Sequence, residues 1–257
     1  KHQISSKILD LGVFEAKDAV KIDKRVRFGL SDEEIKSIIL EEKPKIVGIT
    51  SMYSVYYRDV VEISATIKKI DPSIQIVIGG NHAYSYWKYI LKNKNIDYVV
   101  IGEGEETFLD LSRAILENKD KKAIKGISFR NENGDIIRTE ARNLIEDLDT
   151  IPFPALDMID FVKYMGEGNP YAMYPPAASI ITSRGCPQSC VYCTVKAVWG
   201  RKWRGRSPRN VADEIEYIKN KYNVKEFVFL DDSASVNRKR WEGICDEIIS
   251  RKLNIKW

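Results

Sequence analysis

The sequence lacks the features that mark membrane and secreted proteins. No run of about 18 apolar residues occurs in its 257 residues, although a membrane-spanning helix needs one of that length. The N-terminal segment has neither an initiator Met nor the apolar core of a signal peptide. Four cysteines make a poor disulfide framework in a chain of this size. These absences favour a cytoplasmic protein that does not enter a membrane.

Negative charge is missing from one long stretch of the chain. The net charge is only +4, which by itself gives no argument for nucleic acid as a partner. Between Glu167 and Asp213, however, there is no acidic residue, while basic residues lie on or beside a cluster of cysteines. They are Arg184, Lys196, Arg201, Lys202, Arg204, Arg206 and Arg209. The stretch either binds negatively charged groups or is a basic loop exposed to solvent.

The first half of the chain alternates short apolar runs with helical periodicity, which predicts an α/β fold around a parallel sheet. The apolar runs are rich in Ile and Val, as in strands that are buried on both faces. We expect strands at residues 7–11, 45–50, 74–78 and 98–101. Helices are expected at residues 31–40, opened by a capping box of Ser31 and Glu34, and at 60–70, 85–91 and 106–116.

Three of the expected strands end in polar or glycine-rich turns. The turns are Thr50-Ser51-Met52, Gly79-Gly80-Asn81-His82 and Gly102-Glu103-Gly104-Glu105. In a parallel sheet the carboxyl ends of the strands line the ligand crevice, where glycine lets the backbone approach a large planar or phosphate-bearing ligand. Glycines at strand ends are also plain turn residues. The pattern alone leaves both interpretations open.

The second half predicts a hairpin, a linker and a new unit. The hairpin lies at residues 127–130 and 136–139 about Asn133-Gly134, at the edge of the first domain. Prolines then interrupt residues 147–176, which predicts an irregular linker. The new unit is expected to hold a strand at 178–182, the cysteine loop, a helix capped by Ser207 with Pro208 in its first turn, a strand at 226–230 and a helix at 237–252. We therefore expect domains at 1–125 and 177–257, joined through 126–176.

Three cysteines within eight residues form a candidate metal site. Cys186, Cys190 and Cys193 follow a predicted strand, and three such thiolates can hold a [4Fe-4S] cluster while one iron stays open. Zinc is the main alternative, but a fourth ligand is hard to find. Cys245 shares a helix face with Trp241, which favours a buried apolar thiol. Incidental cysteines are the remaining interpretation.

The segment from Thr182 to Cys193 resembles the radical S-adenosylmethionine enzymes. Their hallmark is Cys-x-x-x-Cys-x-x-Cys with an aromatic residue before the third cysteine, here Tyr192. Residues 200–208 and 229–232 are similar to the subgroup with an N-terminal cobalamin-binding domain. That domain carries Pro-x-Ile-Val-Gly-Ile-Thr, Gly-Gly-x-His and Gly-Glu-Gly-Glu, which stand here at residues 44–50, 79–82 and 102–105, and residues 147–155 resemble its interdomain linker. The resemblance spans nearly the whole chain.

The resemblance implies a flavodoxin-like (Rossmann-like) cobalamin-binding domain followed by the start of a radical SAM partial (β/α)6 barrel. In the family, the open iron of the [4Fe-4S] cluster chelates the amino and carboxylate groups of S-adenosylmethionine. One electron cleaves the carbon-sulfur bond, and the resulting radical abstracts hydrogen from the substrate. The electron comes from a donor such as flavodoxin or ferredoxin. The implied cofactors are therefore the cluster, S-adenosylmethionine and cobalamin.

The resemblance also assigns residues. Cys186, Cys190 and Cys193 would be the catalytic cluster ligands, and Tyr192 would pack beside the adenine. Asp231 or Asp232 would contact the methionine amino group, unless this acid pair caps a helix. Cobalamin would lie over the three turns, on Ser51, Met52, Gly79, Gly80, His82, Gly102, Glu103, Gly104 and Glu105.

No histidine is expected on cobalt. Cobalamin carriers that supply one use Asp-x-His-x-x-Gly, and no such motif occurs in these residues. His82 is the only candidate, and at a strand end an imidazole more often bonds to nearby groups than to a metal.

Two departures from the family pattern predict an internal fragment. We expect the first strand and helix of the cobalamin-binding domain to be missing, and the barrel to stop after about two of its six β/α units. The function that the resemblance implies is methylation of an unactivated carbon in a small-molecule or peptide substrate. A cobalamin-dependent radical cyclase or rearrangement enzyme is the alternative. A tRNA-modifying methylthiotransferase is opposed by the absence of cysteine from residues 1–185, and a zinc-stabilised binding module is the non-enzyme alternative.

Overall fold

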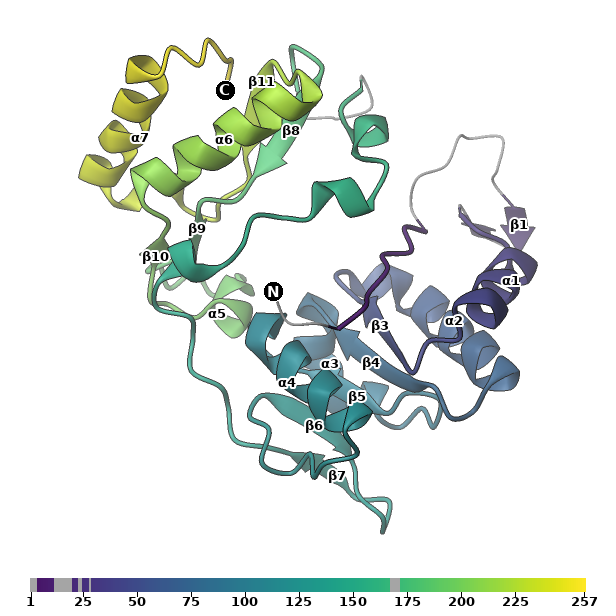
Figure 1. Ribbon diagram of the computed structural model, residues 1–257. Helices are drawn as coiled ribbons and strands as arrows, with labels where there is room; N and C mark the ends of the chain where they lie inside the picture. The colour runs from purple at the N-terminus through teal and green to yellow at the C-terminus, as the bar shows by residue number, and fades with distance from the viewer. Residues whose placement is uncertain (1–3, 12–19, 23–24, 28, 167–171) are drawn as a thin grey trace. The chain divides into compact units, whose positions relative to one another are not determined.

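The computed structural model describes residues 4–11, 20–22, 25–27, 29–166 and 172–257 (Figure 1). The chain forms two compact units. The sheet unit holds residues 30–145 and 189–200, and the α6/α7 unit holds residues 1–29, 146–188 and 201–257. Residues 167–171 of the predicted linker lie outside the described residues.

The sheet unit is built on a five-stranded mixed sheet with the order β3-β4-β5-β6-β7. The strands are β3 (Ile46–Thr50), β4 (Gln75–Gly79), β5 (Tyr98–Val100), β6 (Ile127–Arg130) and β7 (Ile136–Arg138). The first three are parallel, and β6 and β7 are each antiparallel to the strand before them. This confirms the predicted strands after residue 45 and the hairpin at the edge. The domain bounds predicted from the sequence remain a prediction.

The helices of the sheet unit confirm the predicted order, but three of them begin earlier than expected. They are α1 (Asp32–Glu42), the 3-10 turn η2 (Ser54–Tyr56), α2 (Tyr57–Ile70), α3 (Asn81–Ile90), α4 (Gly104–Leu116) and the short α5 (Val195–Val198). Ser31 and Glu34 form the predicted capping box on α1. None of the three, α2, α3 and α4, has a side-chain cap at its start. No capping residue therefore marks the starts of these helices in the sequence.

The core of the sheet unit lies between the strands and α4. Its buried cluster consists of Val77, Val100, Leu111, Ile127 and Phe129. The three middle residues of β4 are all buried, as expected for a parallel strand with both faces covered. This packing fixes the strand ends, from which the turns emerge.

The α6/α7 unit pairs two parallel strands with two helices (Figure 1). Its elements are η3 (Leu148–Thr150), η4 (Leu156–Met158), η5 (Phe161–Tyr164), β8 (Ala177–Ile180), β9 (Ser183–Arg184), β10 (Arg204–Gly205), α6 (Pro208–Tyr222), β11 (Glu226–Phe229), η6 (Ala234–Val236) and α7 (Arg238–Ser250). Ser207 caps α6 with Pro208 in its first turn, as predicted. Lys256 makes an isolated parallel bridge to Glu226.

The core of this unit takes in part of the predicted linker. Ile180, Ile215 and Phe227 are fully or almost fully buried in one cluster with Met165. Leu156 and Phe161 pack against the same cluster. The linker is irregular, as predicted, and its apolar side chains extend the core of the α6/α7 unit.

One predicted strand is wrong. Residues 7–11 belong to no strand, because an apolar run forms a strand only where a neighbour supplies backbone partners. A short antiparallel hairpin, β1 (Val20–Ile22) with β2 (Arg25–Arg27), was not predicted. Within the described parts of the chain, none of the helices is long and apolar enough to cross a membrane.

Candidate functional site

The turns after β3, β4 and β5 lie at one edge of the sheet, because the three strands are parallel neighbours. The first two turns are joined directly by backbone hydrogen bonds. Ser51 N donates to Gly79 O at 2.7 Å, and His82 N donates to Ser51 O at 3.0 Å. We call residues 51–52, 79–82 and 102–105 the turn edge. The structure therefore brings the predicted cobalamin residues of the first two turns together.

Gly80 is required by the way in which these turns meet. Its φ is +99°, and a Cβ atom there would lie 2.7 Å from Ser51 O and 2.9 Å from Ser51 C. Gly102 also has a positive φ, of +89°. At Gly79 and Gly102 an added Cβ would meet nothing within 4 Å. The turn edge thus combines one tight backbone contact with two open glycine positions, where a flat ligand can approach the backbone.

His82 and Ser51 bring buried polar atoms to this edge. The His82 Nδ1 shares a hydrogen bond of 2.8 Å with Ser54 Oγ. Within the described part of the chain, His82 Nε2 and Ser51 Oγ are buried and have no hydrogen-bond partner. Such atoms are rare unless a ligand or water satisfies them. The turn edge therefore fits a cofactor that offers hydrogen-bonding groups.

The His82 ring lies between two tyrosines. The centroid of Tyr57 is 4.6 Å away, and the ring of Tyr86 stacks on it at 4.8 Å. Only 7% of His82 is exposed. This burial lowers the pKa of His82 below its ordinary value of 6.5, because the imidazolium loses its hydration. His82 is therefore a neutral imidazole near pH 7.

The remaining turn residues have different surroundings. Met52 is exposed, whereas Glu103 is buried. The Glu103 carboxylate accepts a hydrogen bond from Ile145 N at 2.7 Å, so it fixes the segment that follows β7. Gly104 and Glu105 form the start of α4 rather than a free turn. An acidic residue in the first turn stabilises a helix, which is an ordinary role for Glu105.

The cysteine loop begins directly after β9. Gly185 turns the chain with a φ of +86°, and Cys193 N donates to Cys190 O at 3.3 Å. All four cysteines are free thiols; Cys190 is exposed and the others are half-buried. Among the described residues, no three side chains of His, Cys, Asp or Glu lie close enough to hold a metal ion. Cys186 belongs to the α6/α7 unit, and Cys190 and Cys193 belong to the sheet unit. Free thiols at this spacing along the chain are the donors that an iron-sulfur cluster needs.

Two further predictions concern residues near the loop. Tyr192 is 85% exposed, so its ring is accessible to a ligand. Cys245 lies on α7 next to the buried Ile244, half-buried rather than fully buried. The predicted full burial of this thiol is therefore not found, and its apolar role stays a prediction.

The two acidic residues after β11, Asp231 and Asp232, have different surroundings. Asp231 accepts hydrogen bonds from Thr182 N at 2.9 Å, from Thr182 Oγ1 at 3.0 Å and from Ser183 Oγ. Asp232 is exposed, and partial desolvation, followed by the charge of Asp231, raises its pKa. Neither acid caps a helix, since Ser233 and Asn237 hold those positions. Asp232 is the acid of this pair that is accessible to a ligand.

The basic stretch is not simply a solvated loop. Arg204 is buried, and Arg206 forms an ion pair with the buried Glu214. Lys202 pairs with Glu146. The guanidinium of Arg206 also lies 5.4 Å from the ring of Phe153. Part of the positive charge therefore meets negative charge inside the α6/α7 unit itself.

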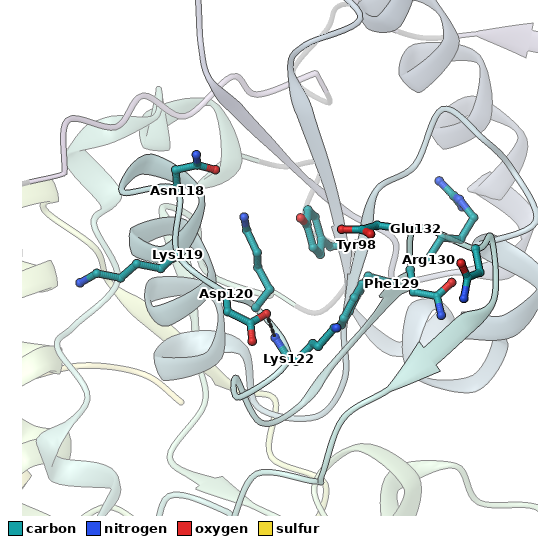
Figure 2. A pocket seen from close by; sticks show the side chains of 11 residues that line it. Tyr98, Asn118, Lys119, Asp120, Lys122, Phe129, Arg130 and Glu132 are labelled. Carbon is teal, nitrogen blue, oxygen red and sulfur yellow. Dashed lines mark hydrogen bonds between the residues drawn. The ribbon is translucent and has the colours of Figure 1, made fainter.

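A pocket of about 430 Å³ lies elsewhere on the sheet unit, at the amino end of β5 (Figure 2). Tyr98 and Phe129 are partners on neighbouring strands, with ring centroids 6.0 Å apart, and Lys119 and Lys122 are among its lining residues. None of the predicted site residues lines this pocket. It is therefore separate from the turn edge, which lies at the carboxyl ends of the strands.

Comparisons with known proteins identify both units. Residues 11–112 match the B12 binding domain, and residues 180–256 match the radical SAM superfamily. The chain is 35% identical over 239 residues to an uncharacterized methyltransferase of Pyrococcus horikoshii, covering 93% of this chain and 50% of that protein. It is 31% identical over 236 residues to the anaerobic magnesium-protoporphyrin IX monomethyl ester cyclase of Rubrivivax gelatinosus, covering 89% and 40%. The chain thus spans half or less of the length of these relatives.

A solved structure agrees with the fold. The cobalamin-dependent S-adenosylmethionine radical enzyme OxsB, with aqua-cobalamin and S-adenosylmethionine bound, matches with a TM-score of 0.70 at 20% identity. The match covers 86% of this chain and 31% of that one. The first domain has the Rossmann-like α/β fold of a B12-binding domain, and residues 180–256 belong to a radical SAM domain. The chain therefore belongs to the radical S-adenosylmethionine enzymes that carry a B12-binding domain.

Proposed function

We propose that this chain is part of a cobalamin-dependent radical S-adenosylmethionine enzyme that methylates an unactivated carbon of a small molecule or peptide. The observation that carries the proposal is the presence of both domains on one chain, with Cys186, Cys190 and Cys193 directly after the first strands of the second. The uncharacterized methyltransferase of Pyrococcus horikoshii supports the proposal, because it is 35% identical to this chain over 93% of its length.

The three cysteines would hold the [4Fe-4S] cluster. When bound, the cluster supplies one electron that cleaves S-adenosylmethionine and generates a carbon radical on its adenosyl group. Gly185 turns the chain into the loop, in which Cys190 is exposed and Cys186 and Cys193 are half-buried. Tyr192 would lie beside the adenine, because its ring is exposed next to Cys193. Asp232 would bind the methionine ammonium, which its exposed carboxylate can pair with.

The turn edge would hold cobalamin. Gly79 and Gly102 leave open backbone for a planar ring system, and Ser51 Oγ and His82 Nε2 would hydrogen-bond to its polar groups. His82 would bond to polar groups of the cofactor rather than to cobalt, because at a strand end an imidazole more often bonds to nearby groups than to a metal, and its ring packs against Tyr57 and Tyr86. When bound, cobalamin carries a methyl group between a second S-adenosylmethionine and the substrate.

A labelled methyl donor tests the proposed reaction. The full-length protein is incubated anaerobically with its substrate, a reductant, cobalamin and S-adenosylmethionine that carries a deuterated methyl group. We expect deuterium in the product together with 5'-deoxyadenosine. A product without label, formed with 5'-deoxyadenosine, would exclude methyl transfer and leave the radical chemistry intact.

The second candidate is a cobalamin-dependent radical cyclase or rearrangement enzyme. The observation that favours it is the 31% identity to the cyclase of Rubrivivax gelatinosus over 89% of this chain. The labelled-methyl experiment separates the two candidates, because a cyclase consumes S-adenosylmethionine without transferring its methyl group. Under either candidate, a flavodoxin or ferredoxin would supply the electron. An oxygen-sensitive cluster on free thiols also fits a reducing, cytoplasmic compartment.

A further inference from the structure

The cysteine loop leaves and re-enters the α6/α7 unit at neighbouring points. Just before the loop, β9 pairs antiparallel with β10, which follows it, and the register joins Ser183 to Gly205. Beside this ladder, Arg206 N donates to Thr182 O at 2.9 Å. We call residues 182–184 and 204–206 the loop base. A ladder of two-residue strands is marginal by itself, so the loop base needs support from other elements.

Arg240 of α7 supplies that support from one side. Its Nε donates to Arg206 O at 2.6 Å, and its Nη2 donates to Thr182 O at 2.7 Å. One guanidinium thus joins the strand that enters the loop to the strand that leaves it. The side chain is buried, with 8% of the residue exposed. Charge-assisted hydrogen bonds are the strong ones, and the planar fork of arginine fixes both carbonyls at once.

Asp231 supports the same base from the end of β11. It accepts hydrogen bonds from Thr182 N at 2.9 Å and from the hydroxyl groups of Thr182 and Ser183. Its negative charge offsets the cost of burying Arg240, because the pKa of Arg240, although lowered chiefly by desolvation, is raised by Asp231. The loop base is therefore held by two opposite charges from two different elements.

Gly205 makes room for the arginine. A Cβ atom on Gly205 would lie 2.6 Å from Arg240 Nε and 2.6 Å from Trp203 Cη2. Trp203 cannot easily move away, since its Nε1 donates to Ser233 O at 3.0 Å. The guanidinium also lies 5.4 Å from the Trp203 ring. The glycine, the tryptophan and the arginine form one packed arrangement at the loop base.

We propose that Arg240 is a positioning residue for the cluster: it fixes the loop base, so that the loop between Arg184 and Arg204 presents its cysteines in one geometry. The cluster part of this proposal rests on the proposed function, whereas the ordering of the loop does not. Arg240 acts on the loop through Thr182 and Arg206, whose carbonyl oxygens it binds.

Three variants of the protein test the proposal. Arg240→Met removes the guanidinium and keeps an unbranched side chain. Arg240→Lys keeps the positive charge, but its ammonium group reaches only one of the two carbonyl oxygens. Arg238→Met is the control, because Arg238 lies on the same helix with a 90% exposed side chain that pairs with Glu242. Two quantities are measured: amide hydrogen exchange of residues 185–203 without metal, and iron content with the electron paramagnetic resonance spectrum after anaerobic reconstitution.

We expect Arg240→Met, which loses both hydrogen bonds, to speed exchange across the loop by at least about tenfold, because the loss of even one charge-assisted hydrogen bond corresponds to a factor of that size. Its cluster content should fall, and the remaining signal should broaden as the cysteines sample several geometries. Arg240→Lys should lie between Arg240→Met and the unchanged protein, and Arg238→Met should match the unchanged protein in both measurements.

Several results would overturn the proposal. Unchanged loop exchange in Arg240→Met is one, and faster exchange with an unaltered cluster spectrum and iron content is another. If Arg240→Met gives no cooperative unfolding transition, Gly205→Ala takes its place, with Gly166→Ala as the control because a Cβ there meets nothing within 4 Å. If the unchanged protein assembles no iron-sulfur cluster, the proposed function fails, while the exchange comparison still decides the role of Arg240.

Discussion

The turn edge and the loop base are built by different means. At the turn edge, backbone groups meet directly, as where Ser51 N donates to Gly79 O, and a glycine permits the contact. At the loop base, the side chains of Arg240 and Asp231 hold a two-residue ladder. A broad ligand needs backbone that no side chain covers. A loop that carries thiols needs side chains from other elements to hold its two ends in place. The first region should therefore be sensitive to glycine and the second to single charged or thiol side chains.

The largest expected effect lies in the cysteine loop. Alanine at Cys186, Cys190 or Cys193 should each abolish cluster assembly, because three ligands already leave one iron open and two cannot hold the cluster. Cys245→Ala should leave it intact, since Cys245 lies on α7. Iron and sulfide analysis after anaerobic reconstitution checks this. If Cys245→Ala also loses the cluster, the assignment of three ligands is wrong.

A buried ion pair beside the loop base should give the next largest effect. Glu214 and Arg206 pair with side chains only 4% and 12% exposed. Glu214→Gln leaves the guanidinium without its counter-charge and should cost about 3 to 5 kcal/mol of unfolding free energy. Glu216→Gln is the matched control on the same helix, because the Glu216 side chain is 44% exposed in its pair with Arg251. Urea unfolding measures both, and equal losses would contradict the dependence on a buried charge.

Two adjacent glycines should separate stability from cofactor binding at the turn edge. Gly80→Ala places a methyl group 2.7 Å from Ser51 O at a φ of +99°, and it should cost about 1 to 3 kcal/mol. Gly79→Ala meets nothing within 4 Å, so it should leave stability nearly unchanged. Because its methyl group enters the space proposed for cobalamin, however, it should weaken cobalamin binding. Unfolding curves and cobalamin titration measure the two effects, and unchanged cobalamin affinity in Gly79→Ala would place the cofactor elsewhere.

The parts that the sequence predicted are those with local signals. Ser31 with Glu34, and Ser207 with Pro208, mark helix starts within four residues of chain, and both are confirmed. The cysteine spacing and the glycine turns are equally local. Residues 7–11 were wrongly predicted as a strand, because an apolar run does not reveal whether a partner strand lies beside it.

The supports of the site could not be predicted in the same way. Arg240 bonds to carbonyls 34 and 58 positions earlier in the chain, and no local pattern marks it. In the sequence it is one of three basic residues at the start of a helix, where a solvated face is the ordinary interpretation. The partner of His82, Ser54, is likewise 28 positions away. Such contacts arise only when the strands have set the register of the turns.

The smallest expected effect tests whether the turn edge keeps water away from the His82 imidazole. Burial lowers the pKa of His82 below 6.5, so the unfolded chain takes up a proton at a higher pH than the folded one. Stability should therefore fall as the pH drops from 6.5 towards the folded-state pKa, because in that range the unfolded state binds more protons. Among its neighbours, Ser54 carries no charge, and burial raises the pKa of Tyr57 above its ordinary value of 10.0, so Tyr57 stays uncharged in this range.

His82→Gln removes this titration, and His2→Gln is the control because the chain has only two histidines. Unfolding free energies are compared between about pH 8 and pH 5, the range in which histidine titrates. Carboxylate titrations are shared by all the proteins and cancel in the differences. We expect His2→Gln to follow the unchanged protein and His82→Gln to lose less stability on acidification. Equal slopes in His82→Gln and the unchanged protein would mean that water reaches the imidazole, and the turn edge would then be open to solvent at the point where its unpaired nitrogen lies.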